Sequence, residues 1–205
     1  MSLHRPWARL QSIWAGSECW RAVSRSQIQP IVVQVLPLEF YDRRTTTVAK
    51  ELLGKILRVR GDQRWRSGVI LETEAYVRND PANHAFHGAT NRNRSMFKGP
   101  GTAYVYRIHQ VYCVNAVTKS GEAVLVRSVR PLEKHSLPID GPGRLCRALG
   151  ITKSKHDGKS LTGRDIQIAD SQIRSRKVSV SRRIGVTKGK NRLLRFLASD
   201  MTSKN

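Results

Sequence analysis

The sequence predicts a single domain of the α+β class, and three observations lead to this expectation. A chain of 205 residues fits one domain. Its 39% of hydrophobic residues is enough to build one core. Short strand-like segments dominate, with helical patterns at the ends of that region, and this order favours α+β over a parallel α/β sheet.

Residues 1–28 are predicted to be a basic extension, disordered or resembling a targeting peptide, ahead of a domain at residues 29–205. The extension holds four arginines, three tryptophans and one acid, and it has no long apolar region of the secretory type. Its composition resembles an organelle transit peptide. A disordered extension or an upstream start codon explains it equally well, so a targeting role is not favoured.

The organised region begins near "LPLEFYDRR" and continues as a helix in "TTTVAKELLGKILRVRG". Thr45 to Thr47 are candidates for the helix N-cap, and Gly54 is expected to end the helix. The side chains expected to face the core are Val48, Leu52 and Leu53.

Strand-like segments follow the helix. "KILRVR" and "RWRSGVILETEAY" flank Gly61-Asp62-Gln63, as the two strands of a hairpin would. Residues 77–101 form a long Asn/Arg/Gly-rich segment, and a loop of that length in a compact domain is usually functional or disordered. "TAYVYRIHQVYCVNAVT" and "EAVLVRSVRP" predict strands joined through residues 119–121. "GPGRLCRALGI" predicts a turn into a short helix, and "RDIQIAD" and "KVSVSRRIGV" predict closing strands.

The charge balance indicates a polyanionic partner. The chain has 37 Lys+Arg against 15 Asp+Glu, a formal charge of +22, and such an excess repels itself unless it meets a polyanion such as nucleic acid. A solvated basic face is the alternative for this surplus. No basic amphipathic helix and no apolar run of about 20 residues is present, so a membrane is the weaker expectation.

The cysteines and histidines do not predict a metal site. Cys19, Cys113 and Cys146 are far apart and form no CxxC pair, which predicts neither a zinc knuckle nor a disulfide framework and favours a reducing, intracellular setting. His84 and His87 in "HAFH" are spaced as a metal pair can be, but no third ligand is evident.

Two carboxylates end an otherwise apolar strand. Because strand side chains alternate between faces, Glu72, Glu74 and Tyr76 are expected to share one side. From geometry alone, acids paired with arginines on a half-exposed strand are the commoner explanation. The aromatic residues that follow favour a pocket in which flat rings stack on an extruded nucleobase and a carboxylate activates water.

At these residues the chain resembles 3-methyladenine (alkyladenine) DNA glycosylases of the MPG type. The shared motifs, in order over roughly residues 36 to 197, are "LETEAY", a following His, "NRNRSMF", "GTAYVYRIH", the Asn of "YCVNAV", "VLVRSVRPLE", "GPGRLCRALGI" and "RIGV…LLRF". The resemblance implies a single α+β domain with a curved antiparallel sheet, flanking helices and a protruding hairpin. It implies a monofunctional base-excision enzyme with no metal or organic cofactor. The expected partner is double-stranded DNA containing a damaged purine, bound by an intracellular monomer.

The resemblance also implies roles for individual residues. Glu74 matches the carboxylate that activates water, and Arg127 matches the basic residue near the reacting nucleotide. The residues that match the base pocket are Tyr76, His84, Tyr106 and Asn115, of which Asn115 excludes 2-amino purines. Glu72 has no catalytic counterpart and is expected to be structural, held by an arginine.

A wedge and a set of DNA backbone contacts complete the predicted site. The family's best-studied members carry a tyrosine wedge three residues after the pocket tyrosine, where this chain has His109 followed by Gln110, so the wedge is predicted to be present but altered. The residues expected to contact the DNA backbone are Arg92, Arg94, Lys98 and Arg144. "GPGRLC" fits a phosphate site at a helix N-terminus and an ordinary turn equally well.

Two rival functions stay open on the sequence. A non-catalytic basic protein that binds RNA or DNA accounts for the charge but gives no reason for a carboxylate in an aromatic pocket. A glycosidase that uses Glu72 and Glu74 is compatible with their spacing of about 6.6 Å along a strand. A neutral sugar, however, does not need so basic a surface.

Overall fold

The structure, a computed structural model, describes residues 34–203 except 133–136 and 172. The predicted basic extension, residues 1–28, lies outside the described residues, as does Cys19. Five short helices occur in the described part of the chain: α1 (Leu38–Tyr41), α2 (Thr45–Glu51), the 3₁₀ helix η3 (Arg94–Phe97), α3 (Pro142–Leu149) and α4 (Lys153–His156). Among these residues no helix is long and apolar enough to cross a membrane.

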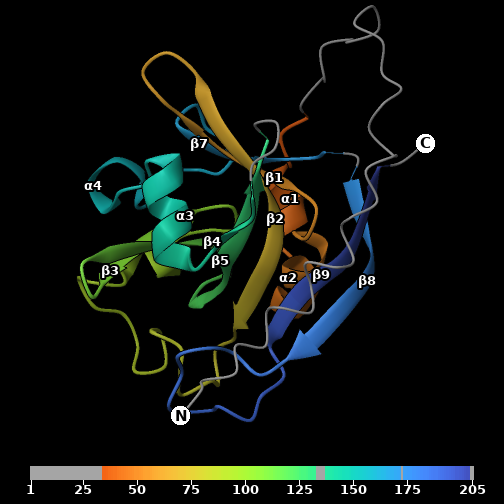
Figure 1. Cartoon of the computed structure of the whole chain (residues 1–205). Coiled ribbons are helices and arrows are strands. Elements are labelled where there is room, and N and C mark those ends of the chain that lie inside the picture. Colours follow the sequence, from red (N-terminus) through yellow and green to blue (C-terminus); the bar gives the residue numbers. More distant parts are fainter. Residues whose placement is uncertain (1–33, 133–136, 172, 204–205) are drawn as a thin grey trace, which may run out of the picture. The chain divides into compact units, whose positions relative to one another are not determined.

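One curled antiparallel sheet organises the described residues (Figure 1). Its main path is β3–β4–β5–β2–β1–β7, while β6 pairs with β5, β9 pairs with β2, and β8 pairs with β9. The strands are β1 (Ile56–Arg60), β2 (Trp65–Tyr76), β3 (Ala103–Ile108), β4 (Val111–Lys119), β5 (Glu122–Pro131), β6 (Ile139–Asp140), β7 (Ile166–Ala169), β8 (Ile173–Ser181) and β9 (Arg195–Ser203). The predicted α+β class, the curved sheet and the flanking helices are confirmed, and the β3–β4 and β8–β9 hairpins are present.

The period-two alternation of the strands gives the sheet two different faces. One face packs on α1, α2 and α3 in the main core, to which β3, β4 and β5 contribute alternate residues: Ala103, Val105, Val114, Ala116, Val124 and Val126. The residues between them point the other way. Tyr104, Val117 and Ala123 form a second cluster on that opposite face, against which Tyr76 and Tyr106 pack. The polar residues of the site share this second face.

In helix α2 the local sequence pattern gave one correct prediction and one wrong one. Val48, Leu52 and Leu53 are buried as predicted. The predicted threonine cap is wrong, because the N-cap residue is Arg44 and makes no side-chain cap bond. The Thr45 hydroxyl instead bonds to Thr118 and Glu122 of the neighbouring strands. A buried hydroxyl needs a hydrogen-bond partner, and that of Thr45 bonds to the neighbouring strands instead of capping the N-terminus of the helix.

The turns follow the sequence more closely. Helix α3 begins with proline and ends at Gly150, whose φ of 74° is the left-handed conformation expected of a glycine C-cap. The β1–β2 hairpin and the β4–β5 turn lie where they were predicted. Helix α2 ends at Glu51, ahead of the predicted Gly54. Strand β9 was not expected, and it pairs with the middle of β2.

Candidate active site

Strand β2 carries the Glu72 and Glu74 carboxylates where it is paired with a neighbouring strand on each edge. Over residues 72–74 it pairs with β5 on one edge and with β9 on the other. The registers place Glu74 beside Leu125, Leu125 beside Asn115, and Asn115 beside Tyr104. Directly paired residues project to the same face of a sheet, so these side chains form one row across the second face.

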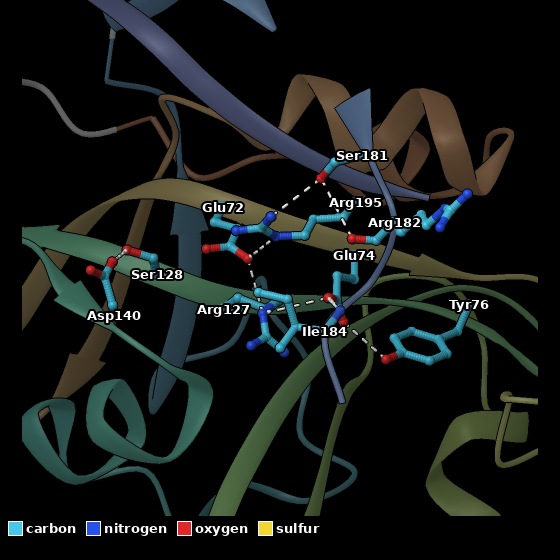
Figure 2. A network of polar contacts seen from close by, with 10 residues as sticks. All are labelled: Glu72, Glu74, Tyr76, Arg127, Ser128, Asp140, Ser181, Arg182, Ile184 and Arg195. Carbon is cyan, nitrogen blue, oxygen red and sulfur yellow. Dashed lines mark hydrogen bonds and ion pairs between the residues drawn. The ribbon is translucent and has the colours of Figure 1, made fainter. Parts of the chain in front are cut away.

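The Glu74 carboxylate is fully buried and fixed by donors on both oxygens (Figure 2). Its Oε1 accepts the backbone N–H of Ile184 at 2.8 Å, and the Tyr76 hydroxyl donates to Oε2 at 2.9 Å. The Arg127 Nε lies 3.5 Å from Oε1. The exposed fraction of the side chain is 0%, so solvent does not reach this carboxylate in the described structure.

Burial dominates the electrostatics of Glu74. Loss of solvent raises the pKa of its carboxyl above the ordinary value. The positive charge of Arg127, the Ile184 N–H and the Tyr76 hydroxyl lower the pKa and offset only part of that effect. A carboxyl with such a pKa accepts a proton more readily than an exposed one, which suits a group that must take a proton from water.

Glu72 is engaged in a different way. Its Oε1 accepts hydrogen bonds from Arg127 Nε at 3.0 Å and from Arg195 Nε at 2.6 Å (Figure 2). The register of β2 against β5 shifts on both sides of Glu72, and Arg127 is the β5 residue without a direct partner there. A bulge of this kind re-aims a side chain, and here it places Arg127 between the two carboxylates. The expectation that an arginine holds Glu72 is confirmed.

Four aromatic side chains gather on the same face as Glu74. His84 Nδ1 and the Tyr104 hydroxyl are 2.9 Å apart. The His84 and Tyr106 rings meet edge to face with centroids 4.5 Å apart, and the Tyr104 and Tyr106 centroids are 5.5 Å apart. Burial lowers the pKa of His84, which favours a neutral imidazole. The structure thus brings Tyr76, His84 and Tyr106, predicted as pocket residues, to one side of the sheet.

Asn115 is buried in the row beside these rings. Its side-chain amide donates to the Tyr104 carbonyl at 3.0 Å, which fixes the orientation of the amide. The Cys113 thiol lies on the same strand face, directly paired with Tyr106, and burial raises the pKa of this thiol. These contacts hold the floor of the predicted pocket in one arrangement.

The predicted wedge residues form the tip of the β3–β4 hairpin. His109 and Gln110 have positive φ of 44° and 65°, and Ile108 pairs with Val111 on either side of them. This is a two-residue turn of a type that favours Asn-Gly, so both side chains occupy strained backbone positions. His109 and Gln110 are exposed, as is Ile108 beside them.

The four residues predicted to contact the DNA backbone are all exposed, and they lie in three parts of the structure. Arg92 lies in the loop after β2 and donates to the Arg107 carbonyl of β3 at 3.3 Å. Arg94 belongs to η3, and Lys98 donates to the Gly158 carbonyl at 3.3 Å. Arg144 lies in the first turn of α3, whose Gly143 packs closely on Val111 of the hairpin.

Sequence reasoning missed the contribution of residues 183–195. This segment supplies the Ile184 N–H to Glu74 and the Arg195 guanidinium to Glu72. It also supplies Arg183, whose guanidinium lies over the Tyr76 ring. The motif "RIGV…LLRF" marked the region, but a backbone donor leaves no residue-type pattern in a sequence.

A buried carboxylate beside a cluster of aromatic rings on a strongly basic chain defines a class, the enzymes that act on a base of nucleic acid. The chain belongs to the methylpurine-DNA glycosylase (MPG) family, whose model matches residues 39–202. A relative from Methanoculleus marisnigri is 41% identical over an alignment of 181 residues, and the match covers 78% of this chain and 93% of the relative. Relatives from Rickettsia rickettsii (38%; 82% and 92%) and Bdellovibrio bacteriovorus (42%; 74% and 87%) are similar in extent. All three bear the name "Putative 3-methyladenine DNA glycosylase".

The activity follows from this membership. The chain is a DNA-3-methyladenine glycosylase, a hydrolase of DNA repair that acts on alkylated adenine in damaged DNA. The family prediction made from the sequence motifs is confirmed.

Proposed function

We propose that the enzyme swings the damaged purine out of the duplex and against the rings of Tyr76, His84 and Tyr106. Glu74 then directs a water molecule at C1′ of the deoxyribose. Flat rings suit an extruded base, and their π-faces attract a cationic alkylated purine. The observation that carries the proposal is the buried Glu74 carboxylate, fixed by Ile184 on the face that holds these rings.

The proposed chemistry needs few groups. The carboxylate faces the positive charge that grows on the sugar as the C–N bond breaks, and it takes the proton of the attacking water. A cationic base such as 3-methyladenine leaves as a neutral molecule, so it needs no general acid. Arg127, whose Nε lies 3.0 Å from Glu72 and 3.5 Å from Glu74, steadies the reacting nucleotide in this proposal. The product is an intact abasic site, because none of the assigned pocket residues is a lysine able to form a Schiff base.

The burial of Glu74 sets a requirement on this mechanism. Because the Tyr76 hydroxyl occupies Glu74 Oε2, it must move aside or share that oxygen before water binds. A carboxylate oxygen has a second lone pair, so sharing is chemically feasible. The Ile184 N–H keeps Oε1 in place meanwhile, and the carboxylate does not need to rotate.

The proposal extends to deaminated purines such as hypoxanthine and to the duplex contacts. A neutral base needs protonation as it leaves, so its excision should be slower than that of a cationic base. His109 and Gln110 fill the gap left by the base, and Arg92, Arg94, Lys98 and Arg144 neutralise phosphates. The enzyme acts as a monomer.

Replacement of Glu74 by Gln tests the proposal. The variant should bind alkylated duplex DNA with the affinity of the parent enzyme and release no 3-methyladenine in a single-turnover assay. Glu51→Gln, an exposed carboxylate paired with Arg43, is the matched control and should leave the rate unchanged. Retained excision by Glu74→Gln would show that another group activates water. Borohydride trapping of an enzyme–DNA adduct would contradict the intact abasic product.

A further inference from the structure

A cation lies behind the ring of Tyr76. The Arg183 guanidinium carbon is 4.6 Å from the ring centroid, on one face of the ring. Arg183 Nη1 donates to the Ala75 carbonyl at 3.1 Å and pairs with Asp80 Oδ2. The side chains of both partners are fully buried, with exposed fractions of 0%. One face of the Tyr76 ring is therefore occupied, and a base can stack only on the other.

The same pair ties together two segments that meet at the site. Asp80 Oδ1 accepts the Ala82 N–H at 3.1 Å, and the Asp80 carbonyl accepts the Asn83 N–H at 2.8 Å, which fixes the turn leading to His84. Gly189 closes over the pair with a φ of 61°. A Cβ at this position would lie 2.8 Å from Asp80 Oδ1, so a side chain is not accommodated there.

The pair is poorly explained by stability alone. Arg183 Nε and Nη2 are buried without a hydrogen-bond partner. Buried ion pairs often contribute no more than apolar residues of similar volume, because desolvation opposes their attraction. An ion pair in this place does change the electrostatic potential at the Tyr76 ring. The cation alone would repel a positively charged base across the ring, and the carboxylate cancels most of that repulsion.

We propose that Asp80 and Arg183 form a positioning and specificity element for the base that stacks on Tyr76. Arg183 sets the plane of the ring, and Asp80 neutralises Arg183 so that a cationic purine is accepted. The inference rests on the proposed function, since it requires the base to stack on this ring. It goes further by assigning the discrimination between cationic and neutral purines to a pair that does not touch the base.

The geometry gives the size of the effect. Stacking adds about 3.5 Å to the 4.6 Å between Arg183 and the ring centroid, so a cationic base lies about 8 Å from the guanidinium. At an effective dielectric constant of about 20, two unit charges at this distance change a binding constant by a factor of about thirty. Loss of Asp80 exposes the base to this repulsion, reduced by whatever screening the pocket provides.

The test compares two bases of nearly the same shape that differ in charge. Duplexes of one sequence carry 3-methyladenine, a cation, or 3-methyl-3-deazaadenine, its neutral isostere, and neither has the 2-amino group that Asn115 is expected to exclude. Dissociation constants are measured in the Glu74→Gln background, so that bound lesions are not released. Asp80→Asn should weaken binding of the cationic duplex by about tenfold relative to the neutral one. The thermal midpoint and the affinity for undamaged DNA report whether the variant is folded.

An unchanged ratio of the two affinities in folded Asp80→Asn overturns the inference. If that variant does not fold, Arg183→Gln decides, because it removes the cation and leaves the carboxylate. The ratio should then stay at or above its original value in favour of the cationic duplex, and a lower ratio overturns the inference. Tyr76→Ala separates the two proposals. If it leaves the preference for lesions over undamaged DNA intact, the stacking role of Tyr76 in the proposed function is itself wrong.

Discussion

Substitution of the two β2 carboxylates should affect different properties: stability for Glu72 and catalysis for Glu74. Glu72 Oε1 accepts from Arg127 and Arg195, and the three side chains are only 10%, 13% and 13% exposed. Removing one partner of a buried pair costs about 3–5 kcal/mol. Because Arg127 retains Glu74 at 3.5 Å and the cluster keeps a little exposure, Glu72→Gln should cost about 3 kcal/mol, the lower end of that range. For a domain of this size the thermal midpoint should fall by about 6–12 °C.

The opposite pattern is expected of Glu74→Gln. Burial raises the pKa of the Glu74 carboxyl, so the folded state binds its proton more readily than the unfolded state does. The ionised form at pH 7 therefore opposes folding, and a neutral amide should leave stability unchanged or raised. Excision should be lost in this variant and should persist, at a reduced rate, in Glu72→Gln.

Urea unfolding and single-turnover release of 3-methyladenine measure the two properties on the same proteins. Glu51→Gln breaks an exposed pair, with side chains 36% and 48% exposed, and as a control should cost less than about 1 kcal/mol. If folded Glu72→Gln is inactive while Glu74→Gln still excises, the two roles have been assigned the wrong way round.

Three further predictions concern pH, the hairpin tip and the basic residues. In the proposed mechanism Glu74 acts ionised, and burial raises its pKa, so the excision rate on a cationic lesion should fall towards acid through a pKa above that of an ordinary glutamate. A rate independent of pH between about 4 and 8, a range that spans the usual carboxyl pKa, contradicts this. The double substitution His109→Asn and Gln110→Gly places residues that tolerate positive φ at the hairpin tip and should stabilise the protein by about 1 kcal/mol. It should also lower excision from duplex DNA more than excision from single strands. An equal effect on both substrates would show that these residues do not act as a wedge. Substitution by alanine should reduce the slope of log affinity against log salt by about 0.9 at each of Arg92, Arg94, Lys98 and Arg144, equally for damaged and undamaged duplexes. If the slope does not change, the substituted residue does not contact a phosphate.

The fold was predictable where the local pattern and the tertiary structure agree. Alternation along β2 to β5, the glycine turn at residue 121 and the proline–glycine bounds of α3 were all visible in the sequence. Strand β9 was not, because its residues have no clean alternation of apolar and polar side chains. Its place is decided by the free edge of β2 and by the ion pair of Arg195 with Glu72. The N-cap prediction for α2 was wrong for a similar reason, since the Thr45 hydroxyl is bonded to residues more than seventy positions away.

The site was predictable in its residue types and not in its connections. Strand geometry placed Glu72, Glu74 and Tyr76 on one side, and the resemblance supplied His84 and Tyr106. The bulge that turns Arg127 between the two acids depends on the register of β5 against β2, which no single segment encodes. The contacts of Ile184 and Arg183 likewise arise only when a distant loop packs on β2.

The distance along the chain between the partners of Glu74 and Glu72 bears on how the enzyme is made. Ile184 lies 110 residues after Glu74, and Arg195 lies 123 residues after Glu72. During synthesis, β2 and its two acids leave the ribosome long before these partners do. Contacts so remote in sequence form slowly, and a nascent chain that ends before residue 184 has the carboxylate without the amide that aims it. The proposed catalytic arrangement of Glu74 and Glu72 is therefore complete only after residues 184–195 have been made and have packed on β2.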